Sequence, residues 1–396
     1  MSVKHFFQNR TVELVLGMAL PGLFYGIVWP NTFYRPSLEE RSAAGAAWRA
    51  KGIDVAVVWP RSRELSFVSG VQLAWEEVDR GSSALAGRIR LRIFDQDNVT
   101  NGREIAAKVA GDSRLVAVLG HETSASATAA SVVYERHGVL FITPKATDPE
   151  LTRHGFDYLF RLTPDDGAIA GALVHYAGKM GFKRIGVLYA RTGQGESFSS
   201  HFVGEASDAG LEVPFERSYL ARDEAESEDF RSLAADVRQE DFDALVIADY
   251  LPRAAELIRD LVRMGVTQPI LGCDKLDSRE LWEVAGPAAN NVYVASAVDP
   301  NADAQQFQTF RKRYREHFGV DPGYGASQGY AAFHLLASAI LLSQTADPLT
   351  VSTTIRCTKP WKGLFGDVSF TNEGDIQGRT ISIKRMQDGV FATVHF

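Results

Sequence analysis

The stretch from Leu115 to Thr152 contains two short apolar segments, each followed by a polar loop. The first reads Leu-Val-Ala-Val-Leu-Gly-His-Glu-Thr-Ser-Ala-Ser over 115–126, and the second reads Leu-Phe-Ile-Thr-Pro-Lys-Ala-Thr-Asp-Pro-Glu-Leu-Thr over 140–152. Ser124–His137 between them can form a helix, so the pattern predicts strand, loop, helix, strand and loop. In a parallel sheet both loops lie at the carboxyl ends of their strands, where open α/β sheets bind ligands.

The predicted helix begins beside the Ser124 hydroxyl. Backbone N–H groups that have no partner within the helix, together with the positive end of its dipole, favour a carboxylate at this point. The same hydroxyl could instead cap the helix without any ligand, because serine is a preferred N-cap residue. Both roles use the same geometry, so the sequence leaves them open.

The alternation of strands and helices extends over most of the chain and predicts an α/β protein with doubly wound parallel sheets. The expected strands are Ile53–Val58, Arg88–Phe94, Leu115–Leu119, Val139–Thr143, Tyr158–Leu162, Arg184–Ala190, Glu212–Tyr219, Ala244–Ala248, Pro269–Gly272 and Val292–Ser296. Arg88–Phe94 alternates as an edge strand does, with Ile89, Leu91 and Ile93 expected to face inward. Near the end, two helices (Ala304–Phe318 and Gln328–Leu342) precede three short strands, which are Val368–Phe370, Arg379–Arg385 and Val390–Val394. Tight turns between these strands predict antiparallel additions to a parallel sheet.

With 396 residues, of which 45% are hydrophobic, the chain is long enough for two domains with separate cores. Its net charge is −7, and no basic stripe is visible, which argues against nucleic acid as a partner. The two cysteines, Cys273 and Cys357, could pair outside the cytoplasm or remain buried thiols. No spacing of histidine, cysteine or acidic residues predicts a metal site or a cofactor.

The N-terminal region predicts export. Lys4 and Arg10 precede Thr11–Trp29, an apolar segment that contains only Glu13 as a charged residue. Its length matches the roughly 20 residues that cross a bilayer, and the preceding positive charges favour a cytoplasmic N-terminus. We expect an uncleaved signal anchor, with a cleaved signal peptide as the alternative. Asn31–Lys51 is then expected to be a stalk or linker.

Several motifs follow one another in an order and spacing that indicate a family. They are Gly120-His121 with its serine-rich loop, Pro144–Thr152, Phe160–Gly167, Tyr250–Pro252 and Phe370–Asp375. Through them the chain resembles the type I periplasmic solute-binding proteins of ABC transporters, specifically the branched-chain amino acid (leucine/isoleucine/valine) receptor family. The resemblance extends from about Gly52 to the C-terminus.

The resemblance implies two α/β lobes that face each other across a cleft and close on a solute by a hinge motion. Residues 52–163 and 298–359 would form lobe 1, residues 164–297 and 360–396 lobe 2, and residues 1–51 the cytoplasmic tip, anchor and linker. The chain would cross between lobes near Leu162–Asp166, Ser296–Asp299 and Trp361–Phe365. The expected partners are a small amino acid-like ligand, a membrane permease or sensor, and the membrane itself, contacted by the N-terminal segment.

The resemblance also implies which residues contact the ligand. They are Thr123, Ser124, Ala125, Lys145, Ala146 and Thr147 from lobe 1, and Gln194, Tyr250 and Asp274 from lobe 2. Ser124 would hold a carboxylate and Asp274 would pair with an ammonium group, a combination that suits an α-amino acid. Each residue also has a purely structural interpretation: packing for Tyr250, a surface loop position for Asp274, and an ion pair with Glu122 or Asp148 for Lys145.

Three features depart from the family pattern. Lys145 replaces a small residue, Gln194 replaces a tyrosine, and the loop Trp59–Leu65 lacks the usual glycine-rich sequence. They favour a more polar or anionic solute than leucine, or a receptor that has lost amino acid binding.

The predicted function is that of an exported, non-enzymatic solute-binding receptor, located outside the cytoplasm. A ligand-sensing receptor domain of a signalling system is the alternative within the same class. A serine hydrolase is the alternative from another class, because Gly325-Ala-Ser327-Gln-Gly329 matches the nucleophile pattern. That elbow requires a preceding strand, which Val320–Tyr324 does not resemble, so we expect Ser327 to be a helix N-cap.

Overall fold

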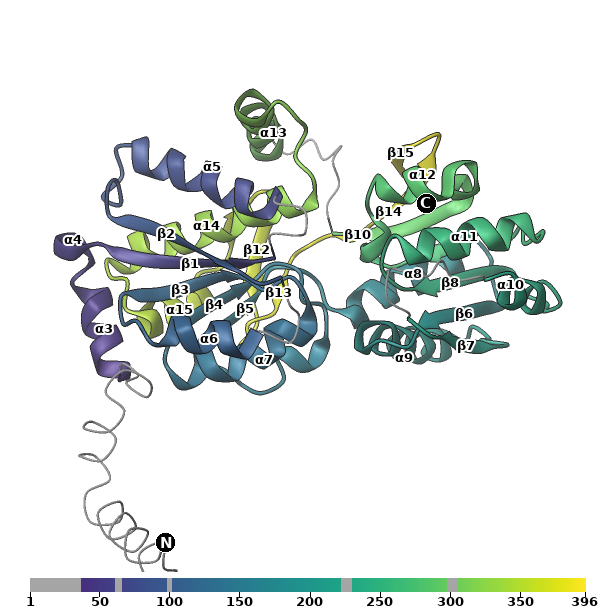
Figure 1. Ribbon diagram of the computed structural model, residues 1–396, viewed down its shortest axis with the longest axis horizontal. Helices are drawn as coiled ribbons and strands as arrows, with labels where there is room; N and C mark the ends of the chain where they lie inside the picture. Colours follow the sequence, from purple (N-terminus) through teal and green to yellow (C-terminus); the bar gives the residue numbers. More distant parts are fainter. Residues whose placement is uncertain (1–36, 61–65, 98–101, 222–229, 298–304) are drawn as a thin grey trace, which may run out of the picture.

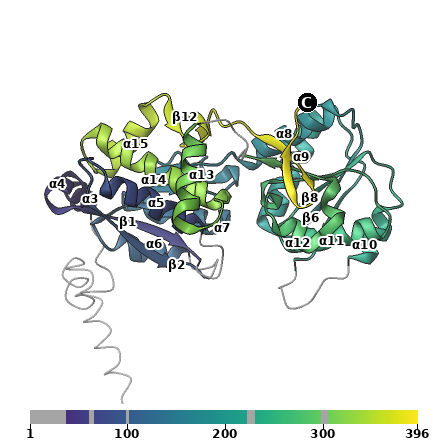
Figure 2. The same ribbon diagram turned by 90° about the horizontal axis from the view of Figure 1, so that it is seen from above.

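The computed structural model describes residues 37–60, 66–97, 102–221, 230–297 and 305–396, which form two α/β lobes side by side (Figures 1 and 2). The predicted anchor Thr11–Trp29 lies outside the described residues. Among the helices that are described, none is both long enough and apolar enough to cross a membrane.

Lobe 1 is built on a parallel sheet of five strands in the order β2-β1-β3-β4-β5. The strands are β1 (Ile53–Trp59), β2 (Ile89–Asp95), β3 (Leu115–Gly120), β4 (Leu140–Thr143) and β5 (Leu159–Arg161). The central strands β1 and β3 are buried along their whole length, because helices cover both faces of the sheet. At the edge, β2 buries Ile89, but the prediction that Ile93 faces inward is wrong. Its side chain is 51% exposed, because an edge strand has a neighbour on one side only.

Two layers of helices enclose the lobe 1 sheet (Figure 1). One face packs against α5 (Ser66–Arg80), α14 (Tyr324–Ser343) and α15 (Pro348–Cys357). The other face packs against α6 (Gly102–Ala110) and α7 (Ser124–Arg136). A further helix, α13 (Gln305–Phe318), adds an aromatic cluster beside α14.

The residues just before β1 belong to lobe 1 and are not a linker, which corrects the prediction for 38–51. They form the helices α3 (Leu38–Ala46) and α4 (Trp48–Lys51). Trp48 is completely buried in the core of the lobe. Arg41, also completely buried, donates hydrogen bonds to backbone carbonyl groups that include those of His137 (2.9 Å) and Ala110 (2.7 Å). These long-range contacts join the segment to the lobe.

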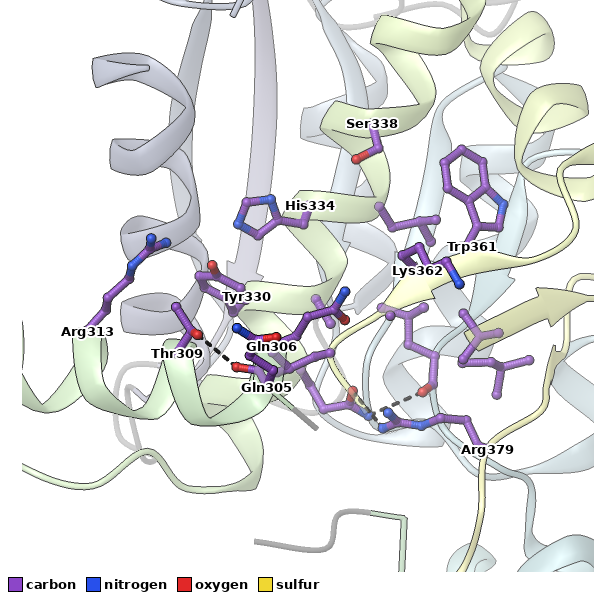
Figure 3. Close-up of a pocket in the computed structure, with 18 residues that line it drawn as sticks. Gln305, Gln306, Thr309, Arg313, Tyr330, His334, Ser338, Trp361, Lys362 and Arg379 are labelled. Atoms are coloured by element: carbon purple, nitrogen blue, oxygen red, sulfur yellow. Dashed lines mark hydrogen bonds between the residues drawn. The ribbon is translucent and has the colours of Figure 1, made fainter. Parts of the chain in front are cut away.

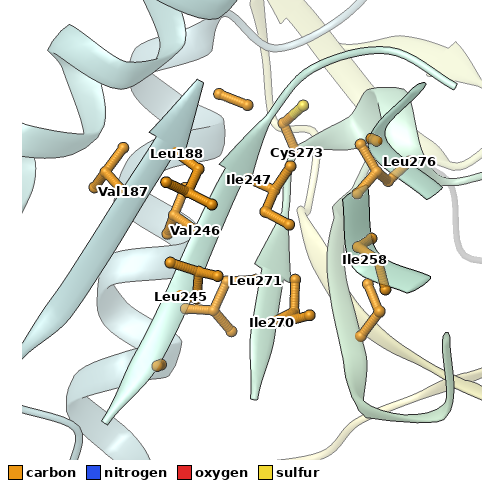
Figure 4. Packing of buried hydrophobic residues seen from close by; sticks show 14 of the residues in the cluster. Val187, Leu188, Leu245, Val246, Ile247, Ile258, Ile270, Leu271, Cys273 and Leu276 are labelled. Carbon is orange, nitrogen blue, oxygen red and sulfur yellow. The ribbon is translucent and has the colours of Figure 1, made fainter. Parts of the chain in front are cut away.

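Lobe 2 contains a seven-stranded sheet in the order β15-β14-β10-β9-β8-β6-β7. The strands are β6 (Ile185–Ala190), β7 (Glu216–Tyr219), β8 (Ala244–Ala248), β9 (Ile270–Gly272), β10 (Val292–Ser296), β14 (Ser382–Gln387) and β15 (Val390–Thr393). The first five are parallel, whereas β14 and β15 pair antiparallel, as the sequence predicts. Aliphatic side chains of β6, β8 and β9 form the centre of the core (Figure 4).

Helices again cover both faces of the lobe 2 sheet (Figure 1). On one face lie α8 (Asp166–Lys179) and α9 (Gly193–Asp208). On the other lie α10 (Arg231–Val237), α11 (Arg253–Arg263) and α12 (Glu280–Ala285). The short 3₁₀ helix η3 (Asp274–Leu276) follows β9 directly.

The third crossing between lobes falls later in the chain than predicted. Residues 361–377 form a small antiparallel sheet of β11 (Trp361–Gly363), β12 (Gly366–Phe370) and β13 (Ile376–Gln377). This sheet packs into the core of lobe 1, where Phe370 meets Phe160 edge-on with ring centroids 5.3 Å apart. The assignment of 360–377 to lobe 2 is therefore wrong, and the chain crosses between Gln377 and Ser382.

Candidate functional site

The predicted site residues lie at corresponding places in the two sheets. Each sheet has the strand order of a doubly wound fold in which the direction of winding reverses next to the first strand. That reversal lies between β1 and β3 in lobe 1, and between β6 and β8 in lobe 2. Ligands bind at the carboxyl ends of strands at such reversal points. Thr123 and Ser124 follow β3, whereas Gln194 follows β6 and Tyr250 follows β8.

The start of α7 forms the lobe 1 side of the site. The side chain of Thr123, not that of Ser124, caps this helix by accepting a hydrogen bond from the Ser126 N–H. Ser124 Oγ accepts hydrogen bonds from the N–H groups of Thr147 (3.2 Å) and Asp148 (3.3 Å). Ser124 thus connects the loops that follow β3 and β4. Its own O–H group remains able to donate to a ligand.

The loop after β4 contributes residues of three different kinds. Ala146 is completely buried in the core of lobe 1, so its side chain is not available to a ligand. Lys145 is 27% exposed, and its ammonium group lies 3.7 Å from a carboxylate oxygen of Glu122, which is one of the two ion pairs the sequence suggests. Thr147 is fully buried, but its hydroxyl has no hydrogen-bond partner among the described residues. Ala125, at the start of α7, is exposed.

On the lobe 2 side, Gln194 and Asp274 come together through Cys273. The Gln194 side-chain amide donates to Cys273 Sγ at 3.8 Å, and its carbonyl oxygen is buried without a partner among the described residues. Asp274 Oδ2 accepts from Lys275 Nζ at 2.9 Å, whereas Oδ1 is likewise buried and unpaired. Nearby, burial raises the pKa of Tyr250 to about 12, an effect that the Lys275 charge opposes. The Tyr250 hydroxyl is therefore a proton donor at neutral pH.

Two charged residues that the sequence did not single out complete the site, Lys275 and Asp166. The Lys275 side chain is only 5% exposed, and its ammonium group also donates to the carbonyl oxygen of Lys145 in lobe 1, at 3.4 Å. Burial alone would lower the pKa of Lys275, but the carboxylate charges, of Asp274 above all and also of Asp166, favour the ammonium form, and the pKa is raised. Lys275 is therefore a buried ammonium ion where the two lobes meet.

Asp166 is the first residue of α8 and is 1% exposed. Its Oδ2 accepts from the Ser197 hydroxyl (2.9 Å), and its N–H group donates to the carbonyl oxygen of Thr147 (2.8 Å) across the first crossing. Burial raises the pKa of this carboxyl group, and the Lys275 charge works in the opposite direction. Its position within the Phe160–Gly167 motif was the available sequence signal. For Lys275, the only signal was its place next to Asp274.

Among the described residues, twelve buried side-chain polar atoms lack a hydrogen-bond partner, and four of them lie at this junction. These four are Thr147 Oγ1, Asp166 Oδ1, Gln194 Oε1 and Asp274 Oδ1. Buried polar atoms are almost always hydrogen-bonded in native proteins, so such a group of exceptions indicates a bound molecule or water. All four can accept a hydrogen bond, and two are carboxylate oxygens. The junction is thus suited to a molecule rich in N–H or O–H donors.

The surroundings of Ser327 do not have the geometry of a serine hydrolase nucleophile. This serine lies inside α14, not at its N-cap, which is Gly323, and its hydroxyl donates to the Gly323 carbonyl oxygen at 3.1 Å. The predicted N-cap role is therefore wrong, and the strand that a nucleophile elbow requires is not present before this helix. Cys273 and Cys357 are both free thiols, one buried and one exposed. In the part of the chain that the structure describes, no group of His, Cys, Asp and Glu side chains could hold a metal ion.

Comparison with known proteins identifies the class that this fold and site define. A family model described as periplasmic binding protein matches residues 60–389, and the chain belongs to this family. The Leu/Ile/Val-binding protein homolog 1 of Brucella abortus (strain 2308) is 28% identical over 343 residues, covering 84% of this chain and 89% of the relative. A leucine-, isoleucine-, valine-, threonine- and alanine-binding protein of Pseudomonas aeruginosa is 25% identical over 317 residues, covering 78% and 82%.

A solved structure agrees with these relatives. The ABC transporter substrate-binding protein of Desulfitobacterium hafniense, in complex with Leu, has a TM-score of 0.78 and 26% identity, covering 87% of this chain and 100% of that chain. The resemblance to the branched-chain amino acid receptors, and with it the type I periplasmic fold, is confirmed.

Proposed function

We propose that this protein is an exported receptor that captures a small, amino acid-like zwitterion between its lobes and delivers it to an ABC-type uptake system. The group of unpaired acceptor atoms at the junction carries this proposal. Its named relatives, which are amino acid-binding proteins, support the same solute class. We further propose that Thr11–Trp29 tethers the receptor to the outer side of the cytoplasmic membrane.

The charges at the junction favour a ligand with an ammonium group. Asp166 and Asp274 provide two carboxylates, whereas among the described residues only Lys275 forms an ion pair with Asp274. With both carboxylates ionised, one negative charge is left over, and an unpaired buried charge is costly unless a ligand neutralises it. The unpaired oxygens Asp166 Oδ1 and Asp274 Oδ1 would accept hydrogen bonds from the ligand ammonium group.

The opposite end of the ligand would lie against lobe 1. The Ser124 hydroxyl has both acceptor positions occupied by N–H groups, so it can donate its proton to a ligand carboxylate. The start of α7 adds a favourable dipole at the same place. The ligand carboxylate would therefore lie on lobe 1 and its ammonium group on lobe 2, which is how a zwitterion would join the lobes.

The test is a thermal-shift screen of the full-length protein against amino acids and against their 2-hydroxy acid analogues, which lack the ammonium group. A ligand that binds the folded state raises the melting temperature by mass action. We expect amino acids to raise it and the hydroxy acids to have little effect. We expect Asp274→Asn to weaken binding about tenfold or more, because it removes a charged hydrogen bond.

The matched control for Asp274→Asn is Asp241→Asn, because the Asp241 side chain is 91% exposed in lobe 2. This variant should bind as the wild type does. Binding of the hydroxy acids in preference to amino acids, or wild-type affinity in Asp274→Asn, would refute the proposed ligand orientation.

A further inference from the structure

A separate cavity of about 420 Å³ lies within lobe 1, between α13, α14 and the small sheet of β11 and β12 (Figure 3). None of the nine residues that the sequence predicted for the ligand site is among the residues that line it. Its volume falls in the range of pockets that hold small organic molecules, roughly 300–1,000 Å³. The cavity therefore has the size of a second ligand site.

The walls of this cavity differ in polarity. Apolar side chains of α14, β11 and β12 provide one wall, including Leu335, Trp361 and Val368. Glutamine and threonine residues of α13 lie across from them, as Figure 3 shows. Pockets that combine an apolar surface with a few polar groups bind molecules that have an apolar body and one polar end.

The charged groups that line the cavity are all positive among the described residues: Arg313, Lys362 and Arg379, with no carboxylate among them. Two of these cations already have partners outside the lining. Arg313 Nη1 lies 3.2 Å from a carboxylate oxygen of Glu77, and Lys362 Nζ lies 2.8 Å from one of Asp367. The remaining cation, Arg379, forms no ion pair with any described residue.

The Arg379 guanidinium group contacts two side chains, but one of its N–H donors has no hydrogen-bond partner among the described residues. Its Nη2 group donates to Gln328 Oε1 at the long distance of 3.5 Å, and its guanidinium carbon lies 4.6 Å from the ring centroid of Phe365. Its Nε–H group is buried without a hydrogen-bond partner among the described residues. Arginine stays protonated in proteins, so the cavity contains an uncompensated positive charge with a spare donor.

We propose that this cavity binds a small organic anion, a monocarboxylate with an aliphatic or aromatic body, whose carboxylate pairs with Arg379. The guanidinium group matches a carboxylate in geometry as well as in charge. The apolar body of the anion would lie against Leu335, Trp361 and Val368. This site is independent of the amino acid site proposed at the junction between the lobes.

Arg379 lies in a segment that connects the two lobes, so a ligand bound to it would contact the hinge. Arg379 lies in the third crossing, between β13 of lobe 1 and β14 of lobe 2. Its partner Gln328 donates to the carbonyl oxygen of Leu162, in the first crossing (3.3 Å), and to that of Pro144, in the loop that carries Thr147 (3.0 Å). An anion seated on Arg379 would therefore attach a hinge segment to α13 and α14.

The test uses isothermal titration of the full-length protein with hexanoate and phenylacetate, with hexanamide and phenylacetamide as uncharged controls. We expect both anions to bind and neither amide to bind measurably. Arg379→Gln should weaken hexanoate binding about tenfold or more, because a charged hydrogen bond is lost. Arg379→Lys should restore part of the affinity, because it retains the charge without the planar guanidinium group.

Two further variants locate the site. Ala331→Phe places a ring in the cavity and should abolish hexanoate binding. This variant tests the site independently of Arg379→Gln, should that variant fold poorly. Arg311→Gln removes a charge of α13 that is paired with Asp321 and does not line the cavity, so this variant should bind hexanoate normally. Asp274→Asn, which alters the junction, should also retain hexanoate binding.

The proposal is overturned if hexanoate and hexanamide bind equally, if neither anion binds at millimolar concentration, or if Ala331→Phe binds hexanoate as the wild type does. Loss of hexanoate binding in Asp274→Asn would also overturn it, because the anion would then occupy the junction. A failure of the amino acid screen leaves these results unaffected, so the two proposals can fail separately.

Discussion

His121 connects β3 to α7 in a left-handed backbone conformation, with a φ of 59°. Its imidazole is completely buried, where Nδ1 lies 2.7 Å from the Ser126 hydroxyl and Nε2 lies 2.9 Å from the Tyr134 hydroxyl. Burial lowers the pKa of His121 to about 3. The residue therefore holds the start of α7, and with it Thr123 and Ser124, as a neutral hydrogen-bonding group.

This burial predicts a pH dependence of stability. An ordinary histidine has a pKa of about 6.5, so between about pH 6.5 and pH 3 the unfolded chain binds a proton here that the folded chain does not. The free energy of unfolding should therefore fall as the pH drops through this window, by at most about 1.4 kcal/mol per pH unit from this residue. Above about pH 6.5, His121 is neutral in both states and has no such effect.

Chemical denaturation of the wild type and of His121→Asn between pH 7 and pH 5 measures this contribution. Asparagine tolerates the left-handed conformation. The variant therefore removes the titratable imidazole without adding much backbone strain. We expect the variant to be less stable at pH 7 but to lose less stability on acidification. His154→Gln, which alters an exposed histidine, should keep the wild-type slope. Parallel curves for the wild type and His121→Asn would contradict the expectation.

At the scale of elements, the contact between α5 and α14 explains the motif that resembles a hydrolase elbow. Gly329 in α14 lies so close to α5 that a Cβ atom would be 2.1 Å from the Phe67 carbonyl oxygen. Gly70 in α5 approaches α14 equally closely, since its Cβ atom would be 2.0 Å from the Ala326 carbonyl oxygen. The glycines of the pattern thus allow two helices to pack backbone to backbone, which requires residues without side chains.

Gly329→Ala should therefore destabilise the protein by about 1–3 kcal/mol or more, since the helices must move apart to accommodate the methyl group. The matched control is Gly204→Ala in α9, where nothing lies within 4 Å of the added Cβ atom. This control should stabilise by about 0.5–1 kcal/mol, because alanine loses less backbone entropy than glycine on folding. Both values come from denaturation followed by circular dichroism. Equal changes in the free energy of unfolding for the two substitutions would show that the close contact between α5 and α14 does not require a glycine at position 329.

At the scale of the whole molecule, the C-terminal segment is divided between the lobes. Phe370 of β12 belongs to the core of lobe 1, whereas Met386 of β14 belongs to the core of lobe 2. Arg161 at the end of β5 strengthens the lobe 1 assignment of this segment, because its Nε group donates to Asp375 Oδ1 at 2.8 Å. The side chains of Phe370 and Met386 are both almost completely buried. They therefore form a matched pair for testing which lobe β12 and β14 each stabilise.

We expect Phe370→Ala and Met386→Ala each to lower stability by about 2–5 kcal/mol, as large-to-small substitutions in a core do. Hydrogen exchange measured by mass spectrometry should separate their effects. Phe370→Ala should speed exchange in β4 and β5 of lobe 1, and Met386→Ala in β9 and β10 of lobe 2. Faster exchange of β9 and β10 in Phe370→Ala, with β4 and β5 unchanged, would restore the original assignment of β12 to lobe 2.

Much of this architecture could be predicted from the order of residues along the chain. Short apolar segments that end in small polar residues predict the central strands, and the family motifs predict the two-lobed fold. The position of Thr123 and Ser124 in a loop at the carboxyl end of a strand was predicted in the same way, since such a loop depends on neighbouring residues only. The sequence left open whether Ser124 caps the helix, and the structure gives that role to the neighbouring Thr123, a one-residue difference that is typical of helix ends.

Contacts between distant parts of the chain decided the rest, because a linear pattern does not show which segments pack together. The burial of Trp48 in lobe 1 and the packing of Phe370 on Phe160 set the limits of that lobe. The contact between Lys275 and the Lys145 carbonyl group joins residues 130 positions apart, and it places an ammonium ion of the protein itself beside Asp274. Local propensity thus predicts strands and helices, whereas lobe boundaries and the charge balance of the site follow from packing and desolvation.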